Sequence, residues 1–187
     1  MQPINKINSF EAIVHRLKKT LPESIETYHT NQSSTYPLIK TVLGKGNPQR
    51  VLISAGIHGD EPGSVESLLS FLQDEHYLPY INKWEITLLP CINPHGYEFG
   101  IRENHQGMDL NRLFKVDEPP IEVFFAQSIL SIPFELTIEL HEDNESTGYY
   151  LYQKGIDAKD DKLGVKILDA IKNIMPINLD DEIDGSS

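Results

Sequence analysis

Two side chains that can bind a metal ion lie three positions apart in the stretch HGDEPG. His58 offers an imidazole and Glu61 a carboxylate. An apolar run, VLISAG, precedes them and apolar residues at helical spacing follow, so the stretch is predicted to be a strand-to-helix turn. Both side chains can point into one crevice there, although a lone HxxE pattern is also common in ordinary loops.

A second histidine completes a recognisable set of ligand types. His141 follows the apolar, strand-like run FELTIEL, 80 residues after Glu61. Two histidines and one carboxylate are a ligand set of catalytic zinc, which keeps a fourth position open for water and lowers the pKa of that water to about 7. Taken alone, His141 could equally be an ordinary histidine at the end of a strand.

A polar stretch between these ligands carries groups suited to an anionic substrate. Residues 93–114 contain Arg102, Asn111 and Arg112. Arginine presents a planar fork of donors that matches a carboxylate, so the set indicates a substrate with a free carboxylate and an oxyanion to be stabilised. A solvated loop with surface salt bridges is the alternative for this stretch by itself.

Strands and helices are predicted to alternate along the chain. The expected strands are 36–44, 51–56, 83–92, 134–140 and a short one at 148–153; the expected helices are 9–19, 62–73, 119–130 and 161–174. A long polar loop is expected from Asn93 to about Asn111. This alternation predicts an α/β sheet with helices on both faces, whose functional groups collect at the carboxyl ends of the strands. His58, Asn93 and His141 all fall at such ends.

Composition narrows the class of protein. The 187 residues suit a single domain, and 28 acidic against 16 basic residues give a formal net charge of −12, which argues against a nucleic acid or an anionic membrane as the main partner. The single cysteine, Cys91, excludes an internal disulfide. Neither a signal peptide nor an apolar run of ~18 residues is found, so a cytoplasmic protein is expected.

The order HxxE, NPxGxE, arginine, DLNR and a strand ending in histidine resembles the zinc carboxypeptidase family. The match spans residues 51–152 and is most similar to the bacterial branch, which includes murein-peptide amidases and succinylglutamate desuccinylase/aspartoacylase-like proteins. The resemblance implies a mixed, mostly parallel twisted sheet and one zinc ion per chain. It implies that His58, Glu61 and His141 bind the zinc. It also implies that Arg102 holds the oxyanion, while Asn111 and Arg112 bind the terminal carboxylate of the substrate. Asp109 is a candidate to orient this arginine loop, although an exposed surface acid is the interpretation that the sequence favours for it.

Relatives use a general-base glutamate on a late strand, and no counterpart is evident here. Glu182 lies in a polar tail without a strand pattern and is a poor candidate, so residues 1–187 are expected to form a single catalytic domain truncated at its C-terminus, without its last strands.

The first hypothesis is a zinc hydrolase in which zinc-bound water attacks an amide bond next to a free carboxylate: a metallocarboxypeptidase, peptide amidase or N-acyl amino acid deacylase. The second is a catalytically silent module that binds zinc and carboxylates. A serine or cysteine hydrolase is disfavoured, because G-x-S-x-G is absent and Cys91 has no basic neighbour. The choice among peptide, muropeptide and N-acyl amino acid substrates stays open, as does the oligomeric state.

Overall fold

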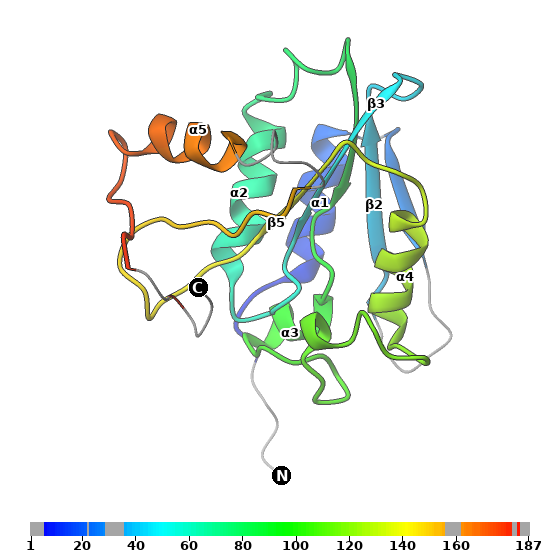
Figure 1. The fold of residues 1–187 in the computed structure, drawn as a ribbon. Coiled ribbons are helices and arrows are strands. Elements are labelled where there is room, and N and C mark those ends of the chain that lie inside the picture. Colours follow the sequence, from blue (N-terminus) through cyan, green and yellow to red (C-terminus); the bar gives the residue numbers. More distant parts are fainter. Residues whose placement is uncertain (1–5, 22, 29–35, 156–161, 181–182, 184–187) are drawn as a thin grey trace. The chain divides into compact units, whose positions relative to one another are not determined.

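A five-stranded sheet lies at the centre of residues 1–142, the first of two units into which the chain divides (Figure 1). The computed structural model describes residues 6–21, 23–28, 36–155, 162–180 and 183. The second unit comprises residues 143–187. Each unit is described by itself.

The strands of the first unit are arranged in the order β1-β2-β4-β3-β5. They are β1 (Ile25–Tyr28), β2 (Leu38–Leu43), β3 (Gln49–Ala55), β4 (Trp84–Leu89) and β5 (Leu136–Leu140). β3 pairs in parallel with both β4 and β5, whereas β2 pairs antiparallel with β1 and β4. β2 alone runs against the other four described strands, which confirms the mixed, mostly parallel α/β sheet expected from the sequence.

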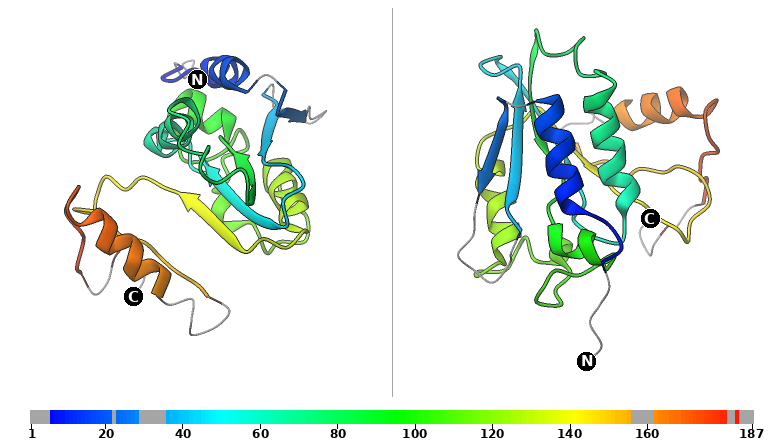
Figure 2. Two further views of the ribbon diagram at one scale, coloured as in Figure 1. Left: turned by 90° about the horizontal axis from the view of Figure 1, so that it is seen from above. Right: turned by 180° about the vertical axis from the view of Figure 1, so that it is seen from behind.

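Helices cover both faces of this sheet, as expected. α1 (Phe10–Thr20) and α2 (Pro62–Gln73) pack together on one face, and α4 (Ile121–Leu130) lies on the other (Figure 2). Consecutive residues of β3, Val51 and Leu52, are buried in the two different hydrophobic clusters. Burial on both faces explains why this strand reads as a continuous apolar run.

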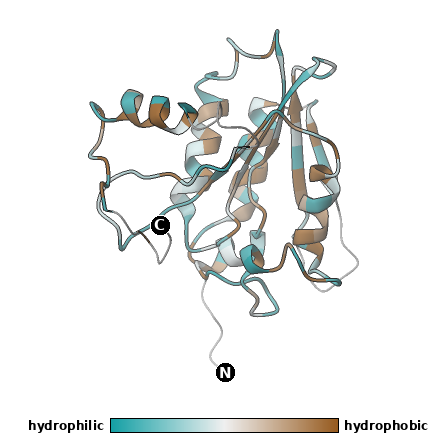
Figure 3. Cartoon of the chain, in the orientation of Figure 1, coloured by the Kyte–Doolittle hydropathy of each residue, from teal (hydrophilic) through white to brown (hydrophobic). Residues whose placement is uncertain are grey.

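The predicted signals at the starts of two helices are present. The Ser9 side chain accepts a hydrogen bond from the backbone N–H of Ala12 at 3.2 Å, which caps α1, and Pro62 is the first residue of α2. α4 is mostly apolar along its length (Figure 3), so it buries against the sheet and contributes Val123 and Ala126 to the core.

The predicted polar loop 93–111 is wrong in part, because it contains two short helices. α3 (Pro94–Phe99) begins where the Asn93 side chain accepts a hydrogen bond from the Gly96 N–H at 2.8 Å, and it ends at Gly100 in the left-handed conformation. The 3-10 helix η1 (Leu110–Arg112) is capped by Asp109. Neither is long enough to show a helical period. The four-residue edge strand β1 was also not predicted.

The strand predicted at residues 148–153 is absent. In the described part of the second unit, Tyr149 forms an isolated bridge with Ile177, and Gly148 at the start of the predicted strand has φ +84°, outside the extended region. The predicted helix 161–174 is present as α5 (Lys162–Ile171). Of the described helices, none has the length and apolar character needed to span a membrane.

Candidate metal centre

The predicted ligands leave the same edge of the sheet from two neighbouring strands. β3 ends at Ala55 and β5 at Leu140, and these two residues are partners in the parallel register. His141 follows β5 at once, whereas His58 lies three residues beyond β3 in the turn before α2. Glu61 occupies the N-cap position of α2. The register therefore brings together residues that are 80 positions apart.

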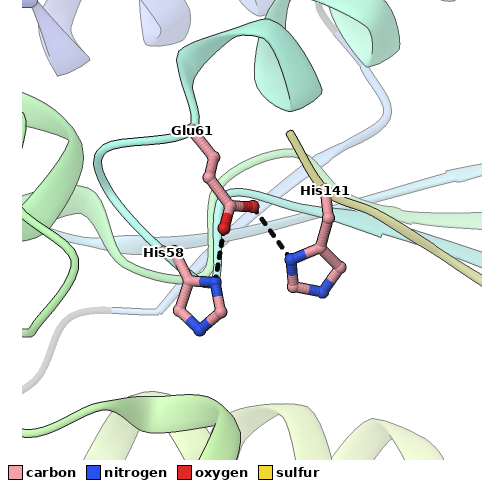
Figure 4. Close-up of side chains that lie close together, drawn as sticks. All are labelled: His58, Glu61 and His141. Atoms are coloured by element: carbon pink, nitrogen blue, oxygen red, sulfur yellow. Dashed lines mark hydrogen bonds and ion pairs between the residues drawn. The ribbon is translucent and has the colours of Figure 1, made fainter. Parts of the chain in front are cut away.

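Glu61 stands between the two histidines (Figure 4). Its Oε1 lies 2.6 Å from His58 Nδ1 and its Oε2 lies 2.8 Å from His141 Nδ1. One possible ligand atom from each residue falls within 4.8 Å of the others, and no further group of this kind occurs in the described parts of the chain. Three donors of the types that metal ions prefer thus converge on one point.

The cluster keeps its carboxylate ionised. Burial opposes ionisation of Glu61, but hydrogen bonds from His141, His58 and the Glu142 backbone N–H outweigh it and lower the pKa of Glu61 to about 2. Interaction with Glu139 and then with Glu61 raises the pKa of His141 to about 9, against the effect of burial. The carboxylates of Glu61 and Glu139 cause the shift at His141, and their negative charge is what a bound cation would neutralise in place of that proton.

Each histidine turns its second nitrogen toward another carboxylate. His58 Nε2 lies 3.2 Å from Asp109 Oδ1, and His141 Nε2 lies 3.8 Å from Glu139 Oε2. Histidines that bind metals almost always donate the second N–H in this way, which fixes the ring and makes the ligand nitrogen more basic. The donor set and its supporting carboxylates therefore fit a metal ion held through both Nδ1 atoms and Glu61.

Two glycines of the ligand turn lie in close contact with other parts of the site, Gly59 with α3 and Gly63 with Glu142. A Cβ on Gly59 would lie 1.9 Å from the carbonyl carbon of Gly96 and 2.3 Å from the backbone nitrogen of Tyr97. On the other side of the turn, the Gly63 N–H donates to Glu142 Oε2 at 2.7 Å, and a Cβ there would lie 2.8 Å from the same oxygen. Gly59 is thus required by contact of backbone with backbone rather than by an unusual backbone angle, whereas at Gly63 the flexible Glu142 side chain could move away.

The arginine loop meets the ligands through Asp109. Arg102 Nε donates to Asp109 Oδ2 at 3.1 Å, and Arg102 Nη1 lies 3.8 Å from Glu61 Oε1. Arg112 Nε lies 3.9 Å from Asp109 Oδ2, with 76% of its side chain exposed, and the Asn111 backbone N–H donates to Asp109 Oδ1 at 3.0 Å. All three predicted substrate-side residues thus surround one carboxylate beside the predicted metal ligands. Their roles stay predictions.

The family model described as "Succinylglutamate desuccinylase/Aspartoacylase catalytic domain" matches residues 47–182 of this chain. The chain belongs to this family. The resemblance inferred from the motifs is therefore confirmed, and the matched segment includes all six predicted site residues.

The proteins to which this chain is similar include carboxypeptidases and an amidase. Murein peptide amidase A of Escherichia coli (strain K12) is 38% identical over 78 residues, which are 42% of this chain and 31% of that protein. Carboxypeptidase E of Caenorhabditis elegans is 26% identical over 207 residues, covering 81% of this chain and 44% of the relative. A metallo-carboxypeptidase from Pseudomonas aeruginosa, solved in complex with (2-guanidinoethylmercapto)succinic acid, has the same fold with a TM-score of 0.61 at 24% identity, over 75% of this chain and 42% of that one. The chain spans less than half the length of each.

Sequence reasoning missed two buried polar residues near the site, Asn104 and Glu122, each 1% exposed. Asn104 resembles any turn residue in a polar loop. Glu122 did carry a signal, as the one charge within the apolar run IEVFFA. Glu182, the weak candidate for a general base, lies outside the described residues.

Proposed function

We propose that this chain is a zinc-dependent hydrolase that cleaves an amide bond next to a free carboxylate. The observation that carries the proposal is the convergence of His58 Nδ1, His141 Nδ1 and the Glu61 carboxylate on one point, with Arg102 alongside. Family membership supports it, since the family description and the relatives name a desuccinylase, an acylase, an amidase and a carboxypeptidase. One zinc ion would be held by His58, Glu61 and His141.

A bound zinc ion would supply a water of lowered pKa and would polarise the substrate carbonyl. The residues around it prepare that chemistry. Glu61 is held ionised, and the carboxylates of Asp109 and Glu139 face the outer nitrogens of the two histidines. Among the described residues, Arg102 Nη2 has no protein partner, so this N–H group can donate to an oxyanion that develops next to the metal ligands.

The substrate class follows from the second arginine. The largely exposed Arg112 stands on the same loop as Arg102, which suits recognition of a carboxylate that arrives from solvent. The Pseudomonas aeruginosa metallo-carboxypeptidase binds a succinic acid derivative, which supports a carboxylate ligand for this fold. We therefore propose peptides with a free C-terminus and N-acyl amino acids as the substrates to test.

A second candidate is a module that binds zinc and carboxylates without turnover. The three carboxylates that approach the ligand residues are already engaged: Asp109 with Arg102, Glu139 with His141, and Glu142 with the Gly63 N–H. Within the described residues, each carboxylate beside the ligands therefore already holds another group of the protein, and none stands apart as a dedicated general base. This observation favours binding without hydrolysis by the 187-residue chain.

Zinc content and hydrolysis together separate the candidates. The purified chain should contain about one equivalent of zinc, and His141→Ala should remove most of it because two donors hold zinc poorly. Hydrolysis of N-acetyl-aspartate, N-succinyl-glutamate or a peptide with a free C-terminus would establish the enzyme. Stabilisation by these ligands without product would establish the silent module. If His141→Ala retained a full equivalent of zinc, the ligand assignment would be wrong.

A further inference from the structure

One side chain organises the turn of the arginine loop. Asn104 Oδ1 accepts hydrogen bonds from the backbone N–H groups of Gln106 at 2.9 Å and Met108 at 3.1 Å. Its backbone N–H donates to the Met108 carbonyl at 3.0 Å, and its carbonyl accepts from the Gly107 N–H at 2.9 Å. Residues 104–108 therefore close around a single amide that is 1% exposed.

A buried carboxylate on α4 stands behind this amide. Asn104 Nδ2 points to Glu122 Oε2 at 3.5 Å, and His105 Nδ1 lies 3.5 Å from Glu122 Oε1. Both separations are long for hydrogen bonds, yet Glu122 is only 1% exposed. A carboxylate removed from water needs partners, and these two neighbours both belong to the arginine loop. Glu122 thus couples the loop to a helix of the core.

The ring closed by Asn104 lies between the two residues that meet the metal ligands. Arg102 comes two positions before it and Asp109 one position after Met108, and the two side chains join at 3.1 Å. Asp109 then faces His58 Nε2 at 3.2 Å. The start of the loop is tied separately, because Asn93 Nδ2 donates to the Arg102 carbonyl at 3.1 Å. A change in the shape of the ring would move Arg102 and Asp109 relative to each other.

We propose that Asn104, backed by Glu122, is a positioning residue that holds Arg102 and Asp109 against the metal centre. This inference rests on the proposed function and deepens it. Asn104 itself has no contact with the predicted ligands in the structure. Its effect would pass through Asp109, which orients His58, and through the distance from Arg102 to Glu61.

A swap of donor and acceptor tests the pair. Asn104→Asp keeps an oxygen for the N–H groups of Gln106 and Met108 but sets a second carboxylate against Glu122. The double variant Asn104→Asp, Glu122→Gln again pairs a donor with an acceptor. In it the new amide at position 122 would donate to the new carboxylate at position 104, so the direction of the bond is reversed. Gln106→Glu is the matched control, because it adds the same charge at an exposed position of the same loop.

The readouts are the zinc dissociation constant, from competition with a chromophoric chelator, together with kcat, KM and the stability of the metal-free protein. Groups that orient a metal ligand change affinity or activity by about 10–100-fold, so Asn104→Asp should weaken zinc binding and lower kcat by at least about 10-fold while KM changes less. The double variant should recover most of both losses. Gln106→Glu should leave both parameters unchanged.

A folded Asn104→Asp variant with the zinc affinity and kcat of the wild type would overturn the inference, as would a double variant as impaired as the single one. If Asn104→Asp does not fold, Asn104→Ser carries the same test, because it keeps one oxygen acceptor and loses the amide that faces Glu122. A wild-type chain that binds zinc without turnover would contradict the proposed hydrolase, and the zinc constants would still decide the role of Asn104. A wild-type chain that binds no zinc would refute the proposed metal centre and this inference with it.

Discussion

Gly59→Ala tests whether the contact between two glycine backbones, Gly59 and Gly96, sets the spacing of the predicted metal ligands. The added Cβ would stand 1.9 Å from the Gly96 carbonyl carbon. Non-bonded carbon atoms rest about 3.5–4.0 Å apart, so the turn and α3 must separate by about 1.5 Å or more. The atoms that it meets are backbone, and no side chain can rotate away. The movement therefore falls on the turn between His58 and Glu61.

The expected losses can be scaled from this clash. Overpacking costs about 1–3 kcal/mol, and a clash of backbone with backbone should reach the upper end, about 3 kcal/mol. In a domain of this size each 1 kcal/mol lowers Tm by about 2–4 °C, so the metal-free variant should melt about 6–12 °C below the wild type. Zinc affinity should fall by about 10–100-fold, because the ligands lose their alignment.

The assay is thermal unfolding of the metal-free protein followed by zinc titration at a temperature where both proteins are folded. Gly46→Ala is the control, because Gly46 has φ +92° and open space around the added Cβ. Its cost should be backbone strain of about 1–2 kcal/mol, without effect on zinc affinity. A Gly59→Ala protein that matches the wild type in both measurements would refute the claim that this contact positions the ligands.

Two further substitutions probe the edges of the site. Arg112→Ala should raise KM by about 10-fold or more with little change in kcat. The reason is that an exposed arginine that binds the substrate carboxylate stabilises the ground state and the transition state equally. A comparable fall in kcat would instead show that Arg112 takes part in the chemical step. Cys91 is buried, and burial raises the pKa of its thiol well above the usual range, so the native protein should resist iodoacetamide and Cys91→Ala should keep its zinc and any activity. Loss of activity in a folded Cys91→Ala protein would point to a thiol mechanism.

Apolar spacing and cap residues in the sequence predicted the helices and strands that are long or that begin at a recognisable cap. α2 and β5 fall where apolar spacing, Pro62 and the run before His141 place them, because burial of one face dictates such spacing. The six-residue α3 could not be detected by period, although Asn93 and Gly100 mark both of its ends. The apolar and aromatic run 148–153 was misread, since β-propensity forms a strand only where a partner strand is available.

The site was predictable to the extent that it follows from strand ends. The sequence could place His58 and His141 at carboxyl ends of strands, and the family resemblance joined them to Glu61. It could not show that Asn104 is buried or that Glu122 lies behind it, because both depend on the packing of a loop against α4. Residues that act on a ligand through another side chain, as proposed for Asn104, lie at no fixed distance from it in the sequence, so no motif reveals them.

The register of the sheet explains why these particular residues meet. Ala55 pairs with Leu140, so His141 leaves β5 beside the point where the chain turns toward His58. After β4, the N–H of Asn93 donates to the Gly56 carbonyl at 2.8 Å, which starts the segment that carries the arginine loop at the same edge. A slip of one residue in β5 would turn every side chain of that strand to the opposite face and would carry His141 away from Glu61. The candidate metal centre is therefore specified by strand pairing, and the loops add the groups that hold each predicted ligand in its orientation.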